Sequence, residues 1–373
     1  MNFVPVLHGL RGLAALAVLL FHWEATYPAL SKAMADISLP LIGQVDLFLP
    51  LRYGWLGVSW FFVLSGYLLA ATLWEKPLAP RLLAGFWWRR ALRIYPAVWV
   101  QVIILLAVVL GFGIMKDFQL SNAIGNAMLW LSPLPGGARI YNGVYWTLPI
   151  ELSFYLFLPV MLWWYRRTSI WVFVLSCLAI TVGWRAGLAG LHLMQSPHAI
   201  SLLFIRGVLP GMLFLFACGM ALNHWQPPQT EASRNQWLVI AMVSGVVLTA
   251  IHYQLRAFQI QDHLYMLMFE VALAVPIALM TACMLKPSRL TAWVSAAPLV
   301  WLGEISFGLY LWHFPIQRML PRLITHEWDT PMGSLQALAI SLVGSLVLAS
   351  ISYYWLERPV LTRLSGRRLK AGR

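Results

Sequence analysis

The chain has 373 residues, of which 60% are hydrophobic and 10% are charged, whereas a soluble domain has roughly a quarter of its residues charged. The composition therefore excludes an ordinary soluble domain and indicates a protein whose apolar surface lies in a lipid bilayer. The formal net charge is +13, but the basic residues form no stripe with interleaved aromatic residues, so nucleic acid is excluded as a partner.

Apolar segments long enough to cross a membrane recur along the chain. A bilayer core of about 30 Å is crossed by a helix of about 20 residues. The sequence therefore predicts an all-α, multi-pass protein of the inner or plasma membrane, with about ten transmembrane helices. Because only a short segment, 357–373, follows the last span, we expect one transmembrane domain over 1–373 with no appended soluble domain. The predicted spans lie near 6–24, 54–74, 94–114, 146–165, 169–190, 202–222, 237–253, 264–285, 297–317 and 335–356.

The distribution of Lys and Arg between the loops predicts the orientation of these spans. Cytoplasmic loops carry an excess of basic residues. With a cytoplasmic N-terminus, the inner segments hold 16 Lys and Arg residues and the outer segments hold 7. Both termini are therefore expected in the cytoplasm, and the two longest loops, 25–53 and 115–145, are expected to face outward.

The first predicted span contains two ionisable residues, Arg11 and His22. Eleven residues at 100° each place both side chains on one helix face, about 16 Å apart along the axis. In the predicted orientation Arg11 lies toward the cytoplasm and His22 near the outer surface. Ionisable residues inside spans usually mark a functional site or a specific pair. The alternative is a snorkelling arginine and an interfacial histidine.

Arginines gather at the predicted cytoplasmic end of the third span. Arg90 and Arg93 share one helix face, and this spacing suits binding of phosphates by several charge-assisted hydrogen bonds. The alternative is an ordinary topology signal, because basic residues are common at a cytoplasmic boundary.

The fourth span begins with Thr147, a residue type that caps helices, and has Pro149 in its first turn. Glu151 then lies one turn inside the predicted outer face, with Tyr155 four residues further on the same side. A carboxylate close to an outward-facing histidine is the functional interpretation. Compensation of the helix dipole is the alternative role for this glutamate.

The ninth span brings a serine, a tyrosine and a histidine to one helix face, namely Ser306, Tyr310 and His313. His313 again falls toward the predicted outer surface. The alternative for Tyr310 is a place in the aromatic belt at the membrane interface.

Together these residues predict a polar site at the outer end of the spans and a basic, phosphate-binding region at their cytoplasmic end. That arrangement suits a phosphate-bearing donor from the cytoplasm and an acceptor from outside. No metal site is expected, because the cysteines at 177, 218 and 283 lie in apolar runs without metal-type spacing.

Six segments follow one another in a specific order along the ten predicted spans: 7–22, 57–69, 90–96, 146–155, 305–313 and 357–359. In this order they resemble the acyltransferase-3 family of integral membrane acyltransferases over nearly the whole chain. One departure is His8, which precedes Gly9, where the family often has an acidic residue. The departure puts the detail of the first turn in doubt.

The resemblance implies transfer of an acyl group, commonly acetyl from acetyl-CoA, to a hydroxyl of a glycan outside the cytoplasm. Acyl-CoA is then the donor substrate, and the partners are a glycan or other hydroxyl acceptor and the lipid bilayer. The resemblance implies that His22 is the catalytic base and that Glu151 is a site residue. Our mechanistic hypothesis adds that Glu151 fixes the tautomer of His22. Arg11, Arg90 and Arg93 are similar to the family's donor-binding or structural residues.

Further site candidates are Ser65, Tyr155, Tyr310 and His313. A covalent acyl-enzyme on Ser65 or His22 stays an open alternative. A transporter or flippase for a glycan or a lipid-linked sugar is the competing class, since transporters also bury charges between helices. Such proteins usually contain an internal repeat, and none is evident in the sequence. A non-catalytic scaffold is the third class, and it would not need polar groups paired on common faces.

Overall fold

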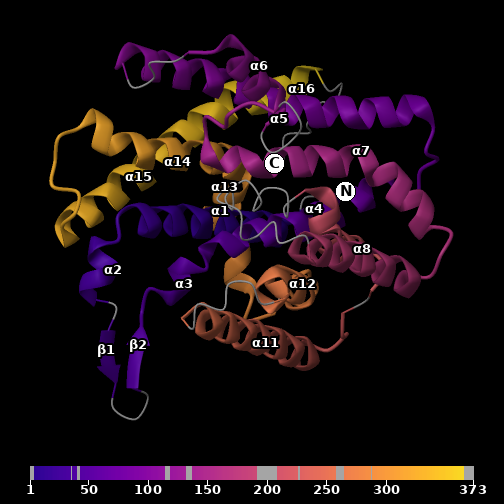
Figure 1. The fold of residues 1–373 in the computed structure, drawn as a ribbon. Helices are drawn as coiled ribbons and strands as arrows, with labels where there is room; N and C mark the ends of the chain where they lie inside the picture. Colours follow the sequence, from indigo (N-terminus) through magenta and orange to yellow (C-terminus); the bar gives the residue numbers. More distant parts are fainter. Residues whose placement is uncertain are drawn as a thin grey trace.

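The computed structural model describes residues 4–364, except for residues 35, 40–42, 114–117, 132–136, 191–207, 226, 258–263 and 287. Within this part the chain is almost entirely helical (Figure 1). Its α-helices are α1 (Pro5–Thr26), α2 (Ala29–Met34), α3 (Leu49–Arg52), α4 (Gly57–Leu73), α5 (Pro80–Gly111), α6 (Leu120–Met128), α7 (Thr147–Tyr165), α8 (Ile170–Gly190), α10 (Leu209–Ala221), α11 (Glu231–Ala257), α12 (Leu264–Met284), α13 (Ala297–Glu304), α14 (Ser306–Leu323), α15 (Pro331–Ile351) and α16 (Arg358–Leu364). Shorter turns are η1 (Gly54–Leu56), η2 (Gly143–Trp146), η4 (Ala292–Ser295) and the π-helical η5 (Ser352–Glu357).

Each predicted span overlaps a helix, but the ten are not equivalent. Two of them, over α10 and the Met268–Met284 part of α12, are apolar but short. The span predicted at 297–317 is two helices, α13 and α14, which meet at Ile305. In the described residues, seven helical segments are long and apolar enough to cross a membrane: Pro5–Thr26, Gly54–Leu73, Pro80–Gly111, Gly143–Tyr165, Ile170–Leu188, Glu231–Leu255 and Pro331–Leu364.

The helical, multi-span architecture is therefore confirmed. The number ten and the side on which each terminus lies stay predictions. Residues 365–373, whose four basic residues entered the orientation count, lie outside the described residues.

The outer loops of the prediction contain structure of their own. An antiparallel hairpin of β1 (Asp36–Leu39) and β2 (Gly43–Asp46) pairs Asp36 with Asp46 and Leu39 with Gly43. The hairpin projects away from the helices between α2 and α3 (Figure 1). The second long loop contains α6, and its residues 132–136 lie outside the described residues.

Helix α1 lies inside the bundle, packed against α4, α13 and α14 (Figure 1). Its contact with α13 depends on glycines, because a Cβ atom at Gly303 would lie 1.9 Å from the carbonyl oxygen of His8. A Cβ atom at Gly12 would lie 2.7 Å from the carbonyl oxygen of Leu299. Small residues allow backbones to approach this closely inside a membrane. The close approach brings Arg11 next to the junction of α13 and α14.

Prolines inside the helices expose carbonyl groups that other helices then bind. Pro315 has no N–H, so the carbonyl of Leu311, four residues earlier in α14, lacks its helical partner. The side chains of Gln101 and Asn142 donate to this oxygen at 2.8 and 2.9 Å. Both side chains are buried, and Gln101 also accepts from the hydroxyl of Tyr145 at 2.7 Å. The proline thus creates the polar contact that joins α5, η2 and α14.

A buried ion pair joins three other helices. Arg185 of α8 is completely buried, and its Nη2 lies 2.8 Å from Oε2 of Glu270 in α12. Its Nε donates to the carbonyl of Gly211 in α10 at 2.8 Å. Pairing with a carboxylate and a carbonyl lets a charged group stay away from water.

Candidate active site

Helices α1 and α14 run parallel, and three contacts along their length establish this. The contacts follow the same order along both segments. They are Arg11 Nη2 to Ser306 Oγ (3.1 Å), His22 Nδ1 to His313 Nε2 (3.0 Å) and Tyr27 Oη to the carbonyl of Gln317 (2.6 Å). Arg11 lies in the second turn of α1, and Tyr27 directly follows its last residue.

The contact between Arg11 and Ser306 lies at the junction of α13 and α14. The Ser306 hydroxyl accepts from Arg11 and donates to the carbonyl of Gly303 at 2.8 Å. This carbonyl lies in the last turn of α13, where helical partners run out. The guanidinium of Arg11 also lies over the ring of Phe61, 5.8 Å from its centroid. Arg11 is therefore held at a break in the helix rather than extended to the membrane surface.

A cavity of about 50 Å³ lies beside Arg11. A water molecule needs roughly 10–15 Å³ of such space, so the cavity holds a few water molecules. Apolar residues of α4, α5, α7 and α14 form part of its wall. Its polar wall consists of Arg11, Ser65, Arg93, Thr147, Glu151, Tyr155, Ser306 and Tyr310. Six of the predicted site residues thus meet in one space.

The carboxylate of Glu151 has two side-chain partners in this cavity. It accepts hydrogen bonds from the hydroxyl of Tyr155 and, at 3.4 Å, from the hydroxyl of Ser65. The backbone carbonyl of Tyr155 is freed by Pro159, and Nε1 of Trp87 donates to it at 2.9 Å. The carboxylate, tyrosine and serine therefore form one hydrogen-bonded group fixed between α4, α5 and α7.

Arg90 and Arg93 do not share the same surroundings. Arg93 lines the cavity. Arg90 packs over aromatic rings, with its guanidinium carbon 5.6 Å from the centroid of Phe86 and 5.9 Å from that of Tyr155. Cation–π contacts of this kind orient a guanidinium without neutralising its charge.

The two histidines near the other end of α1 form a pair. Nδ1 of His22 lies 3.0 Å from the carbonyl of Val18, and Nδ1 of His313 lies 3.0 Å from the carbonyl of Leu309. A carbonyl oxygen only accepts, so each Nδ1 carries a hydrogen. Nε2 of His313 then has a lone pair, so the single Nδ1–H of His22 is shared between this lone pair and the carbonyl of Val18. The lone pair of His22 is consequently on its Nε2.

The environment of the pair distinguishes its two members. His313 is completely buried, whereas His22 is half-buried. The rings of Phe21 and Phe314 lie edge-on to the His22 ring, with centroids 5.0 and 4.9 Å away. An imidazole that is fixed by hydrogen bonds at Nδ1 and keeps the lone pair on Nε2 can take a proton from a molecule that reaches Nε2.

Tyr310 lies between the cavity and the histidine pair. Its hydroxyl lines the cavity and is hydrogen-bonded to Oγ1 of Thr147 at 2.9 Å and to the carbonyl of Val144 at 3.1 Å. Its ring centroid lies 5.8 Å from that of His313. One side chain therefore contacts both parts of the candidate site.

The predicted partner of His22 differs from the observed one. The sequence suggested Glu151 as the group that fixes the tautomer of His22. In the structure His313 hydrogen-bonds to His22, whereas Glu151 is bonded to Ser65 and Tyr155. The sequence analysis placed both His22 and His313 toward the outer side of the membrane, and from this shared placement their contact could have been predicted.

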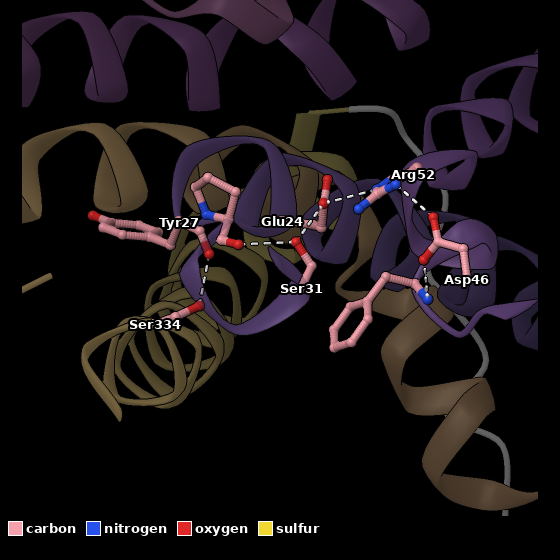
Figure 2. A network of polar contacts seen from close by, with 8 residues as sticks. Glu24, Tyr27, Ser31, Asp46, Arg52 and Ser334 are labelled. Atoms are coloured by element: carbon pink, nitrogen blue, oxygen red, sulfur yellow. Dashed lines mark hydrogen bonds and ion pairs between the residues drawn. The ribbon is translucent and has the colours of Figure 1, made fainter. Parts of the chain in front are cut away.

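A network around Glu24 was not foreseen from the sequence. Glu24 is buried two residues after His22, and its Oε1 accepts from Ser31 at 2.8 Å and from Arg52 at 3.0 Å. Arg52 also binds Oδ2 of Asp46 at 2.5 Å (Figure 2). The network fastens the segment that contains the hairpin to the end of α1.

The last contact between α1 and α14 again uses a carbonyl freed by proline. Pro321 leaves the carbonyl of Gln317 without its helical partner, and the hydroxyl of Tyr27 donates to it. Burial raises the pKa of Tyr27 to about 12, so the hydroxyl keeps the proton that it donates.

Potential metal ligands do not gather in the described part of the chain, where no three His, Cys, Asp or Glu residues are placed to hold an ion. The cysteines at 177, 218 and 283 are buried thiols in separate helices.

Comparison with known proteins identifies the family. The family model described as "Acyltransferase domain" matches residues 4–350. The chain is 26% identical to "Peptidoglycan O-acetyltransferase OatA" of Listeria monocytogenes, over 96% of this chain and 56% of that protein. It is 29% identical to "Acyltransferase MdmB" of Streptomyces mycarofaciens, over 98% of this chain and 93% of that protein. It is 24% identical to "O-acetyltransferase OatA" of Staphylococcus aureus, over 96% of this chain and 57% of that protein.

The chain thus spans a little over half the length of the two OatA relatives, and nearly all of MdmB. No solved structure matches. The match over most of the chain shows that it belongs to the acyltransferase-3 family of integral membrane acyltransferases.

Proposed function

We propose that the protein is a membrane-embedded O-acyltransferase that moves an acyl group, acetyl in the simplest case, from acyl-CoA to a hydroxyl of a glycan. The observation that carries the proposal is the free Nε2 of half-buried His22, set by the hydrogen bond to His313. Acyl transfer to a hydroxyl needs such a base. The names of the OatA relatives, which are O-acetyltransferases, support the same reaction.

In the proposed reaction the hydroxyl oxygen of the acceptor attacks the carbonyl carbon of the thioester. The hydroxyl proton passes to Nε2 of His22 as the C–O bond forms. The tetrahedral oxyanion then collapses, the C–S bond breaks, and the sulfur leaves as CoA thiol with the proton from His22. His313 acts as a positioning residue, because its lone pair stabilises the Nδ1–H of the imidazolium while the proton is held.

The donor is proposed to approach from the Arg11 end of α1. Arg90 and Arg93 bind the CoA phosphates, Arg11 holds the junction of α13 and α14 along the path of the pantetheine arm, and the arm carries the thioester on to His22. The cavity of about 50 Å³ is far smaller than the ligand sites of about 300–1,000 Å³ that drug-sized molecules occupy. Donor binding therefore has to widen it, and the group formed by Glu151, Tyr155 and Ser65 lies where this widening would occur.

The proposal also includes the topology of the chain in the membrane. Both termini are cytoplasmic, ten spans cross the inner or plasma membrane, and residues 1–373 form one transmembrane domain. His22 then lies toward the outer surface, where a cell-wall glycan is accessible. The names of the Listeria and Staphylococcus relatives favour an acceptor of the peptidoglycan type.

The test uses purified protein in nanodiscs, labelled acetyl-CoA and a soluble glycan acceptor. His22→Ala is expected to lower transfer by about 10²–10⁴-fold, because it removes the base. The double variant Arg90→Ala/Arg93→Ala is expected to raise the KM for acetyl-CoA. His224→Ala, which alters a histidine bonded to Tyr165 instead, is the matched control.

Two results would contradict the proposal. Full transfer by folded His22→Ala protein would show that His22 is not the base. Absence of binding and turnover of any acyl-CoA by folded wild-type protein would favour the competing class, a glycan or lipid-linked sugar transporter.

A further inference from the structure

A second cavity lies where α1 and α14 end, beyond the histidine pair. Its volume is about 540 Å³, and it is lined by Thr26 at the end of α1, by Tyr27 directly after it, by Pro321 of α14 and by residues 326–330 before α15. Sites for small ligands commonly have volumes of about 300–1,000 Å³. The cavity is therefore large enough for a ligand, unlike the one beside Arg11.

The side chains around this cavity are mostly hydrogen-bonding groups. Tyr27 and Trp328 line it while almost completely buried, with ring centroids 6.0 Å apart. His326, Glu327 and Asp329 are exposed. Carboxylates make strong charge-assisted hydrogen bonds with hydroxyl donors. A sugar matches this lining, because it carries several hydroxyl groups.

Hydrogen bonds to neighbouring groups hold the walls in place. The backbone carbonyl of Tyr27 accepts from the hydroxyl of Ser334 at 2.6 Å (Figure 2). The hydroxyl of Thr330 donates to the carbonyl of Glu327 at 3.0 Å and accepts from the N–H of Gly333 at 3.0 Å. A site with fixed walls loses little conformational entropy when a ligand binds.

The position of the cavity relates it to the histidine pair. Thr26 follows His22 by four residues, which is about 6 Å along the helix axis. The hydrogen bond between Tyr27 and Gln317 follows the histidine pair in the order of contacts, and Tyr27 itself lines the cavity. A sugar in the cavity would therefore be a neighbour of the sugar at His22 rather than the same one.

We propose that this cavity is a sugar-binding subsite that holds the acceptor glycan one unit away from the sugar that is acylated. The inference rests on the proposed function for its place in the reaction. Sugar binding itself requires only the cavity. The carboxylates of Glu327 and Asp329 bind the hydroxyl groups of the sugar.

The experiment measures binding and transfer separately. Saturation-transfer NMR on protein in nanodiscs, without acyl-CoA, detects binding of a soluble tetrasaccharide of β-1,4-linked N-acetylglucosamine. The double variant Glu327→Gln/Asp329→Asn is expected to weaken this binding about tenfold, because two charge-assisted hydrogen bonds are lost. Both side chains are exposed, so the variant keeps the thermal unfolding midpoint of the wild type. Glu75→Gln, at another exposed carboxylate, is the matched control.

In transfer assays the double variant is expected to raise the KM for the tetrasaccharide about tenfold, and to leave kcat and the KM for the monosaccharide unchanged. Equal binding by the wild type and the double variant, or no binding by the wild type at millimolar tetrasaccharide, would overturn the subsite. Binding that depends on the two carboxylates without any transfer would uphold the subsite and reject the proposed function.

Discussion

Nε2 of His313 lies 3.0 Å from Nδ1 of His22, and the Nδ1 atom of each ring faces a carbonyl one turn back in its own helix. The orientation of His22 is thus set by a neutral neighbour rather than by a carboxylate. In serine hydrolases a buried aspartate performs this task and stabilises the imidazolium by its charge. A second histidine fixes the tautomer in the same way without placing a negative charge in the membrane.

The first prediction concerns this neighbour. His313→Phe removes one of the two acceptors for the Nδ1–H of His22, so we expect kcat for transfer to fall about 10–100-fold with little change in either KM, the range known for groups that orient a metal ligand. His313→Gln has an amide oxygen that can accept in its place, and we expect it to restore part of the rate. If His313 had a purely structural role, both variants would instead have a lower thermal unfolding midpoint, in proportion to the activity that each has lost.

The second prediction concerns the hydroxyl that binds Glu151. Tyr155→Phe removes this donor but keeps the ring that packs under Arg90. A hydrogen bond to a charged group contributes about 1.5–3 kcal/mol, so we expect a lower unfolding midpoint and a raised KM for acetyl-CoA. Tyr145→Phe, another buried tyrosine whose hydroxyl binds the neutral Gln101, is the control. We expect it to leave the KM for acetyl-CoA unchanged.

The third prediction concerns the buried ion pair of Arg185 and Glu270. Arg185→Met leaves Glu270 without this cation, and removal of one partner of a buried pair costs about 3–5 kcal/mol. The double variant Arg185→Met/Glu270→Leu removes both charges, so we expect it to be more stable than Arg185→Met alone. Unfolding midpoints in one detergent measure this coupling, and additive losses would contradict it.

The fourth prediction concerns the carbonyl of Gln317. Tyr27→Phe removes the hydroxyl that binds this oxygen, and an unsatisfied buried acceptor costs about 1–3 kcal/mol. Pro321→Ala supplies an N–H at the position from which a regular helix would bind the same carbonyl. We therefore expect the double variant Tyr27→Phe/Pro321→Ala to recover part of the lost stability. A double variant less stable than Tyr27→Phe would show that the freed carbonyl is not the cause.

The local pattern of apolar residues was sufficient to predict much of the fold. Runs of apolar residues located the helices, because lipid requires long apolar segments whatever their neighbours are. The same regularity placed Arg11 and His22 on one face of α1, and the structure has both facing α14. The junction at Ile305 was missed because the apolar run continues through it, and the glycine contacts that favour it come from α1.

The contacts within the site could not be read from one sequence. His22 and His313 are 291 residues apart, and Arg11 and Ser306 are 295 residues apart. Only helix packing decides which of several polar groups at one membrane face meet. Glu24 was overlooked for the same reason, since its partner Arg52 lies in the predicted loop 25–53, whose path no periodicity describes.

The parallel pairing of α1 with α14 also has a consequence for biogenesis. The ribosome makes α1 first, but the polar partners of Arg11 and His22 on α14 belong to the last fifth of the chain. At about 5–20 residues per second, roughly 15–60 s pass between synthesis of the two helices. During that interval the first helix waits at the insertion machinery or in lipid with its arginine and its glycine face uncovered. Assembly of the candidate site is therefore a late event, and in a nascent chain that stops before α14 this site is incomplete.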